Sequence, residues 1–198
     1  PHHFDVREAN RFLARSLDWV LERLDGVPEA VPFCDGAIIP LRGVQHQVKF
    51  TGPGRRPVVE IQPTLGAHPV LAVSGSPEHA PRRLLDWLSA EARRDLDARV
   101  TQHAKTIGQR AKRITLRDQR SRWGSCSSSG HLSFSWRLVM APPLVLDYVA
   151  AHEVAHLAEM NHGPRFWRLV VRMMPQMEEA KFWLRRNGMD LHRYGADA

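Results

Sequence analysis

The chain has 198 residues, of which 43% are hydrophobic and 25% are charged, with a formal net charge of +7. This apolar content suffices for one sizeable core and excludes a disordered chain, which combines low hydrophobicity with high charge. No apolar run approaches the roughly 20 residues that are needed to cross a bilayer. Two cysteines, Cys34 and Cys126, do not make a disulfide framework, so we expect a cytoplasmic protein.

An amphipathic helix is predicted at the start of the chain, where Asp5 forms an N-cap with Glu8 three residues on. Apolar residues then recur at helical spacing as far as Leu24, and Gly26 ends the run. Between residues 33 and 76, short apolar stretches are separated by Gly and Pro, which predicts a small meander of antiparallel strands. These strands are expected at residues 37–41, 44–50, 58–61 and 70–73.

The second half of the chain alternates between helical and extended patterns. The elements expected there are a long helix from Pro81 to Ile107, strands over 113–117 and 131–138, a helix opened by Pro142 and Pro143, and two last helices near 164–174 and 177–186. Together they predict an α+β fold, in which a small antiparallel sheet packs with helices. A boundary near residue 110 would separate residues 1–110 from a site-bearing region, 111–198, within one continuous compact unit.

The sequence His152-Glu153-Val154-Ala155-His156 lies within the helix that follows the two prolines. Four residues turn a helix by about 400°, so the two imidazoles differ by about 40° in direction and can bind one metal. Zinc accepts imidazole nitrogen at about 2.0–2.1 Å. Glu153 points about 100° away from His152 and can act as a general base toward water beside the metal. The motif predicts a zinc metallopeptidase that hydrolyses peptide bonds.

His162 follows six positions after His156, where an Asn-His-Gly-Pro run lets the chain turn back toward the metal. Three protein ligands and one open position are typical of catalytic zinc. Glu159 is the rival third ligand, or a hydrogen-bond acceptor for an imidazole N–H. Cys126 has no ligand spacing, and the histidines could also be core residues or, for His162, a helix cap.

Basic residues concentrate between Lys105 and Arg122, where seven of them face one acid, Asp118. A nucleic-acid partner would require such a patch to bind phosphate. The alternative is a solvated basic strand and loop, because no nucleic-acid-binding motif accompanies the charge.

Several short motifs occur in order in the C-terminal half. They include Arg122-Trp123-Gly124-Ser125-Cys126, Gly130-His131-Leu132, Trp136-Arg137-Leu138, Asn161-His162 and Phe166-Trp167. Over about residues 113–187 the chain resembles the YgjP-like metallopeptidase family. The resemblance implies a compact zincin-like fold, one zinc ion held by His152, His156 and His162, Glu153 as the base, and a peptide or protein substrate. It also implies an Arg-rich β stretch that is not seen before Asp5, which suggests a truncated version.

Other aspects of the function are less constrained by the sequence. We expect the substrate to add a strand along the edge of 131–138, with Arg122 or His131 as candidate oxyanion stabilisers. The first alternative is a nucleic-acid-associated protein, either a protease acting on DNA-bound proteins, as in the related SprT-like group, or a basic binding module with a degenerate site. The second alternative is a zinc-stabilised scaffold without turnover.

Overall fold

The computed structural model describes residues 6, 10–12, 14–17, 29–54, 57–63 and 66–195. Of the helix predicted at the start of the chain, the described residues at 6, 10–12 and 14–17 are helical, and the rest lies outside the described residues. Three of its described apolar side chains, Val6, Phe12 and Leu17, are exposed. None of the described helices combines the length and apolarity that a membrane span requires.

The first sheet has four strands in the order β1-β2-β4-β3. Its strands are β1 (Ile38–Leu41), β2 (Val44–Phe50), β3 (Val59–Gln62) and β4 (Val70–Val73). The strand positions agree with the prediction, but the expected antiparallel meander is wrong in one pairing, because β2 and β4 run parallel. The Gly- and Pro-containing connection after β2 is too long for a tight hairpin, so β3 takes the outer position and β4 enters between them.

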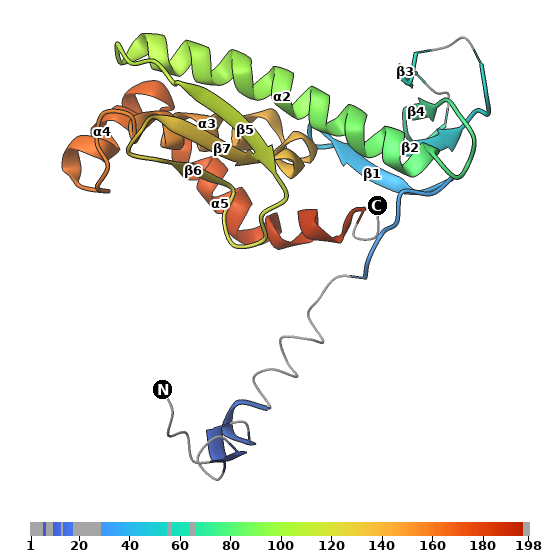
Figure 1. Cartoon of the computed structure of the whole chain (residues 1–198), viewed down its shortest axis with the longest axis horizontal. Helices are drawn as coiled ribbons and strands as arrows, with labels where there is room; N and C mark the ends of the chain where they lie inside the picture. The colour runs from blue at the N-terminus through green and yellow to red at the C-terminus, as the bar shows by residue number, and fades with distance from the viewer. Residues whose placement is uncertain are drawn as a thin grey trace.

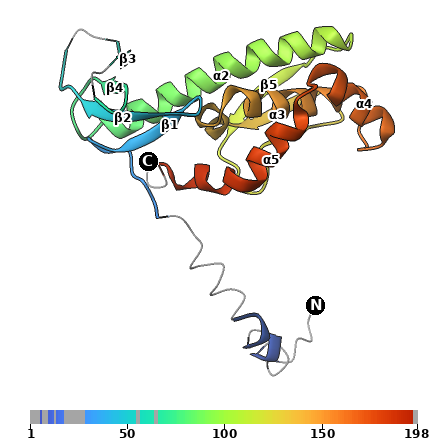
Figure 2. The same ribbon diagram turned by 180° about the vertical axis from the view of Figure 1, so that it is seen from behind.

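The helix α2 (Ala80–Thr106) confirms the predicted long helix. Its buried apolar residues recur every four positions, and each step of four turns the helix about 40° beyond a full circle. The apolar stripe therefore winds around α2. As a result, Leu84 packs in the core beside the first sheet, whereas Val100 packs in the core beside the second. Figure 1 shows that α2 extends from beside the first sheet to beside the second, and Figure 2 shows the same arrangement from behind.

The second sheet has three strands in the order β5-β7-β6. They are β5 (Arg113–Arg117), β6 (Gly124–Cys126) and β7 (His131–Ser135). The predicted strand over 131–138 is too long, since Ser135 accepts a hydrogen bond from the Arg137 amide at 3.3 Å and caps a short 3-10 helix, η1 (Trp136–Met140). The strand is also not an edge: β7 pairs parallel with β5 and antiparallel with β6.

Helices close the fold around this second sheet. They are α3 (Pro143–Ala155), α4 (Pro164–Met173), α5 (Met177–Asn187) and the 3-10 helix η2 (Met189–Arg193). Proline occupies the first turn of both α3 and α4, where its missing N–H costs nothing. The predicted α+β fold class is confirmed.

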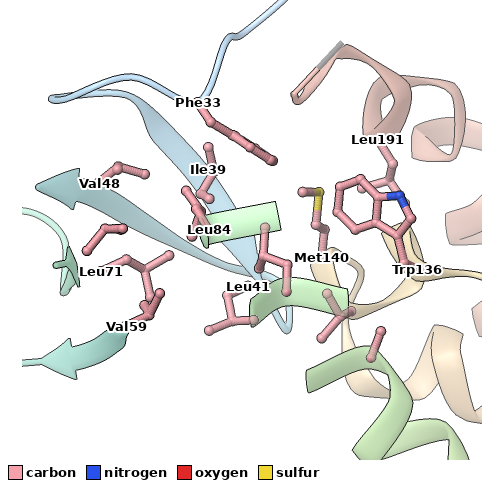
Figure 3. Close-up of a cluster of buried hydrophobic side chains, with 14 of the residues drawn as sticks. Phe33, Ile39, Leu41, Val48, Val59, Leu71, Leu84, Trp136, Met140 and Leu191 are labelled. Atoms are coloured by element: carbon pink, nitrogen blue, oxygen red, sulfur yellow. The ribbon is translucent and has the colours of Figure 1, made fainter. Parts of the chain in front are cut away.

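Buried apolar side chains form two clusters that share α2. The first lies between the four-stranded sheet, the start of α2 and η1, where Phe33, Ile39 and Trp136 point toward one another (Figure 3). The second packs the inner face of the three-stranded sheet against α3 and α4. The second cluster supports the histidine motif, because most residues of α3 are buried. The boundary predicted near residue 110 stays a prediction.

Candidate metal centre

His152 and His156 both come from the end of α3. His152 lies in the last turn of the helix, and His156 follows Ala155 with backbone angles that remain helical, φ −65° and ψ −18°. Because the helical turn continues through His156, both imidazoles leave α3 on one side. Their ring centroids lie 5.1 Å apart. The spacing in the sequence thus produces the pair of adjacent imidazoles that it predicts.

His162 reaches the same point from a turn outside the helix. After α3 the backbone tightens, with the amides of Ala158 and Glu159 both donating to the Ala155 carbonyl at 3.1 and 3.0 Å. The Gly163 amide then donates to the Asn161 carbonyl at 2.7 Å, which turns the chain back. This turn brings His162 Nε2 to 3.1 Å from His152 Nε2.

The three imidazoles fit a tetrahedral metal ion. Ligand nitrogens of His152, His156 and His162 all lie within 4.8 Å of one another, and no other group of three His, Cys, Asp or Glu side chains among the described residues does so. Two nitrogens bound at about 2.05 Å with a tetrahedral angle would be about 3.3 Å apart. The 3.1 Å separation between His152 and His162 is close to that value. Three protein ligands are also the number that catalytic zinc sites use.

Phe166 forms an aromatic support beneath all three histidines. It is fully buried at the start of α4, and its ring centroid lies 4.9, 4.5 and 4.7 Å from those of His152, His156 and His162. Trp167 adds contacts at 5.9 Å to His152 and His162. Sequence reasoning names these two aromatic residues only as part of a family motif and gives them no place in the site. Their position after a helix-opening proline, close behind His162, is the signal that could have found them.

Glu159 supports the site through its main chain. Its carbonyl oxygen lies 3.1 Å from His156 Nδ1. Because a carbonyl can only accept, His156 donates from Nδ1 and keeps the lone pair of Nε2 for a metal. The carboxylate of Glu159 is not in the group of neighbouring ligand atoms, whereas the nitrogen of His162 is. Of the two alternatives for Glu159, the structure therefore favours the hydrogen-bond acceptor.

Burial favours the neutral form of His152 and His156, which is the protonation state that binds metal. The pKa of His152 is lowered to about 4, first by burial and then by the neighbouring charges of His156, His162 and Lys181. Burial also lowers the pKa of His156, although the hydrogen bond to the Glu159 carbonyl acts in the opposite direction. These two residues therefore present unprotonated imidazole nitrogens at neutral pH.

Glu153 lies beside His152 and lines a pocket next to the histidines. It is 6% exposed, and it lines a pocket of about 330 Å³ together with His152, Tyr148 and Gly124. Burial raises the pKa of Glu153 to about 7, while the charge of Arg122 acts to lower it. A carboxyl group with a pKa near neutrality can both accept and return a proton at physiological pH.

Gly124 makes room for this carboxylate. A Cβ at Gly124 would come within 2.6 Å of Glu153 Cγ and 2.7 Å of Glu153 Oε1. Only glycine therefore fits the start of β6 without moving Glu153. Sequence reasoning did not assign Gly124 to the site, although a glycine inside a strand often marks such a close approach.

The remaining candidates from the sequence divide between two pockets. Arg122 lines the pocket of Glu153, whereas His131 lines a second pocket on the outer face of the three-stranded sheet. Cys126 lies in that second pocket, and burial together with the charge of Glu153 raises its pKa to about 11. A thiol that stays protonated is a poor metal ligand. Arg122 is thus the candidate oxyanion stabiliser that the fold brings to the site.

Comparison with known proteins identifies the family. The YgjP-like metallopeptidase domain matches residues 1–187. The chain belongs to the YgjP-like family. The crystal structure of the metallopeptidase zymogen of Pyrococcus abyssi abylysin is similar to half of this chain, with 97% of that protein covered, 21% identity and a TM-score of 0.43. No curated protein matches the sequence.

Membership of the YgjP-like family makes this chain a metallopeptidase, and therefore a hydrolase that requires a metal. The three clustered histidines are residues that could hold such a metal. Their donor set is nitrogen alone, which suits zinc and other late first-row metals better than magnesium or calcium.

Proposed function

We propose that this metallopeptidase hydrolyses peptide bonds with one zinc ion held by His152, His156 and His162, and with Glu153 as the general base. The observation that carries the proposal is the convergence of three imidazoles, with ligand atoms within 4.8 Å of one another, beside a buried carboxylate. Zinc would be bound by neutral imidazole nitrogens with one position left for a reacting group.

The residues of the chain divide the chemistry between them. A zinc ion held by His152, His156 and His162 would supply Lewis-acid chemistry to the reaction. Glu153 accepts the proton of the attacking water and returns it to the leaving amine, which its neutral-range pKa allows. Arg122 lines the same pocket, so its charge can stabilise an oxyanion as it develops.

The substrate strand would lie along β6. The sequence favoured the edge of 131–138, but β7 is the central strand of its sheet and both of its sides are paired. β6 is an edge strand, and its first residue, Gly124, contacts the carboxylate of Glu153. Main-chain pairing with β6 would therefore bring an extended peptide to the general base.

Replacement of Glu153 by Gln tests the mechanism. The variant should bind zinc as the wild type does and should lose peptide hydrolysis by about a hundredfold or more. Metal content and cleavage of a denatured protein substrate are measured on the same preparations. Unchanged hydrolysis in the variant contradicts the role of Glu153.

A matched variant, His162→Ala, tests the third ligand. It should reduce both bound zinc and hydrolysis, because two imidazoles cannot hold the metal as tightly as three. Zinc binding by the wild type without any peptide hydrolysis would instead support the scaffold alternative. A wild type without bound metal would contradict the proposed centre itself.

Nucleic-acid binding stays a prediction. The structure places Arg113, Arg117 and Arg122 around one pocket, but no Phe, Tyr or Trp lines it among the described residues. Single-stranded nucleic acids commonly use such rings to stack bases. Retention on DNA that falls with salt would favour the prediction, and no retention at low salt would exclude it.

We also propose that the protein works in the cytoplasm. Cys34 and Cys126 are free thiols, and Cys34 is exposed. Reducing compartments maintain such thiols. Fractionation of cells that express the protein, with detection in the soluble or the exported fraction, tests the location.

A further inference from the structure

Cations border the pocket that holds the general base. Arg122, Lys181 and Arg185 line it, and the one acid among its lining residues is Glu153. Lys181 forms an ion pair with Glu178 at 2.8 Å, but no carboxylate of the described residues lies within ion-pair distance of Arg122 or Arg185. Two of the three cations at this pocket therefore have no counter-charge supplied by the described part of the fold.

A second cationic pocket, of about 620 Å³, lies on the outer face of the three-stranded sheet. Arg113, Arg117, Arg122 and His131 line it, and no Asp or Glu does so. The nearest acid in sequence, Asp118, is already bound to Arg137 at 2.6 Å. Within the described ranges, neither Arg113 nor Arg117 has a carboxylate within ion-pair distance, so these charges do not serve the fold as salt bridges.

Small hydroxyl side chains form the floor of the second pocket. Thr115 and Ser125 each stand opposite Ser133 in the register of the sheet, so three hydroxyl residues lie side by side across it. Ser133 Oγ is buried, and no hydrogen bond from the described residues reaches it. Hydroxyl groups are donors to carboxylate oxygen. The pocket thus offers both charge and hydrogen bonds to an anionic group.

β6 passes between the two pockets. Gly124 lines the first, Ser125 and Cys126 line the second, and Arg122 borders both. Successive side chains of a peptide paired with β6 would point to opposite faces of the sheet. One set would face the pocket of Glu153, and the other would face the outer pocket. Both sets would therefore meet cations.

We propose that the substrate is an acidic polypeptide, with Asp or Glu side chains on both faces of the strand that pairs with β6, where they neutralise Arg113, Arg117, Arg122 and Arg185. The inference rests on the proposed peptidase function and on binding along β6. An acidic peptide fits better than a nucleic acid, because the cations flank an edge strand and the outer pocket has no Phe, Tyr or Trp for base stacking.

Two quenched fluorescent peptide series test the inference on the zinc-loaded protein. The peptides share one sequence, with Glu at the flanking positions in the first series and Gln in the second. We expect kcat/KM to be at least about tenfold higher for the Glu series at low salt, and the advantage to shrink as salt rises. Equal values for the two series, or faster cleavage of the Gln series, overturn the inference and leave the proposed function standing.

Two arginine variants locate the preference. In Arg113→Gln/Arg117→Gln the ratio of Glu to Gln cleavage should fall by several-fold, because the outer pocket loses two charges. Arg82→Gln is the matched control, since Arg82 is exposed and its ion-pair partner among the described residues is Asp86 on α2. A ratio that changes equally in both variants overturns the assignment to the outer pocket.

A binding measurement keeps the inference testable without turnover. Glu153→Gln with zinc should bind the Glu peptide more tightly than the Gln peptide in fluorescence polarisation. Tighter binding of the Glu peptide, with no hydrolysis by the wild type, would support the inference and contradict the proposed function. If duplex DNA binds through Arg113 and Arg117 and neither peptide shows a preference, the surface serves nucleic acid and the inference is wrong.

Discussion

Gly124 and Glu153 are in direct contact across the boundary between β6 and α3. A single additional carbon on Gly124 would lie 2.6 Å from Glu153 Cγ, which no real Cβ tolerates. The carboxylate occupies the space that a side chain at position 124 of the neighbouring strand would fill. The edge strand and the proposed general base are therefore coupled by steric contact, so the orientation of Glu153 depends on a residue that has no side chain.

The first prediction concerns this contact. Gly124→Ala should lower kcat by about ten- to a hundredfold, because Glu153 must move by an ångström or more away from the attacking water. Bound zinc should remain, since the atoms nearest to the added Cβ belong to Glu153 and not to the three histidines. Gly54→Ala is the control, because its Cβ would meet nothing within 4 Å. Equal activity in both variants would contradict the coupling.

The second prediction concerns the stability of the metal-free protein. Burial raises the pKa of Glu153 to about 7, so between its ordinary value and pH 7 the folded state binds more protons than the unfolded state. The free energy of unfolding therefore falls as the pH rises through this window. At pH 8 the Glu153→Gln variant should be more stable than the wild type by up to about 3 kcal/mol.

Urea unfolding in the presence of a chelator measures this difference. Near pH 4.5 the two proteins should have similar stability, because the wild-type carboxyl is then protonated in the fold. A variant that is less stable than the wild type at pH 8 would mean that an unrecognised partner satisfies the buried charge.

The third prediction concerns acid release of the metal. Protons compete with zinc for imidazole nitrogen, so we expect bound zinc to begin to fall below about pH 6. The lowered pKa of His152, about 4, and that of His156 should make the loss gradual. Zinc content after equilibrium dialysis at stepped pH is the measurement. Glu153→Gln keeps all three imidazoles and should follow the same curve, whereas a site still full well below that range would contradict three histidine ligands.

The fourth prediction concerns Arg137, which is 4% exposed. Its Nε and Nη2 donate to Asp118 at 2.6 and 2.9 Å, and its Nη1 donates to the carbonyls of Leu191 and Tyr194. Arg137→Met removes all of these guanidinium donors, and we expect a loss of about 3 kcal/mol in unfolding free energy. The exposed control Arg82→Met should lose less than about 0.5 kcal/mol.

The ion pair of Arg137 with Asp118 also makes the free energy of unfolding depend on pH. Burial acts to raise the pKa of Asp118, but the hydrogen bonds and charge of Arg137 outweigh it and hold the pKa below its usual value. The folded state therefore binds fewer protons than the unfolded state near the ordinary pKa. The stabilisation is present above about pH 4 and is lost as the pH falls through the lowered pKa. In Arg137→Met this acid-dependent loss should shrink, because Arg137 is the largest of the groups that lower the pKa of Asp118.

Local patterns in the sequence predict most of the elements. The steps of four along α2, the prolines at Pro143 and Pro164, and the short apolar runs of the first sheet each act within a few residues, so they can be read without knowledge of the fold. The spacing of His152 and His156 is of the same kind, because one helical turn relates them. The pairing of strands cannot be predicted from such local signals. The parallel pairing of β2 with β4 depends on which segments the whole chain brings together.

The sequence by itself determined the α+β class, the helix with its two histidines and the chemistry that those side chains favour. Only the tertiary structure decided that β7 is central, that β6 is an edge strand, and that Gly124 and Phe166 belong to the candidate site. The physical reason is range: helical periodicity and capping depend on neighbours in sequence, whereas contact between Gly124 and Glu153 depends on how a strand packs on a helix far along the chain.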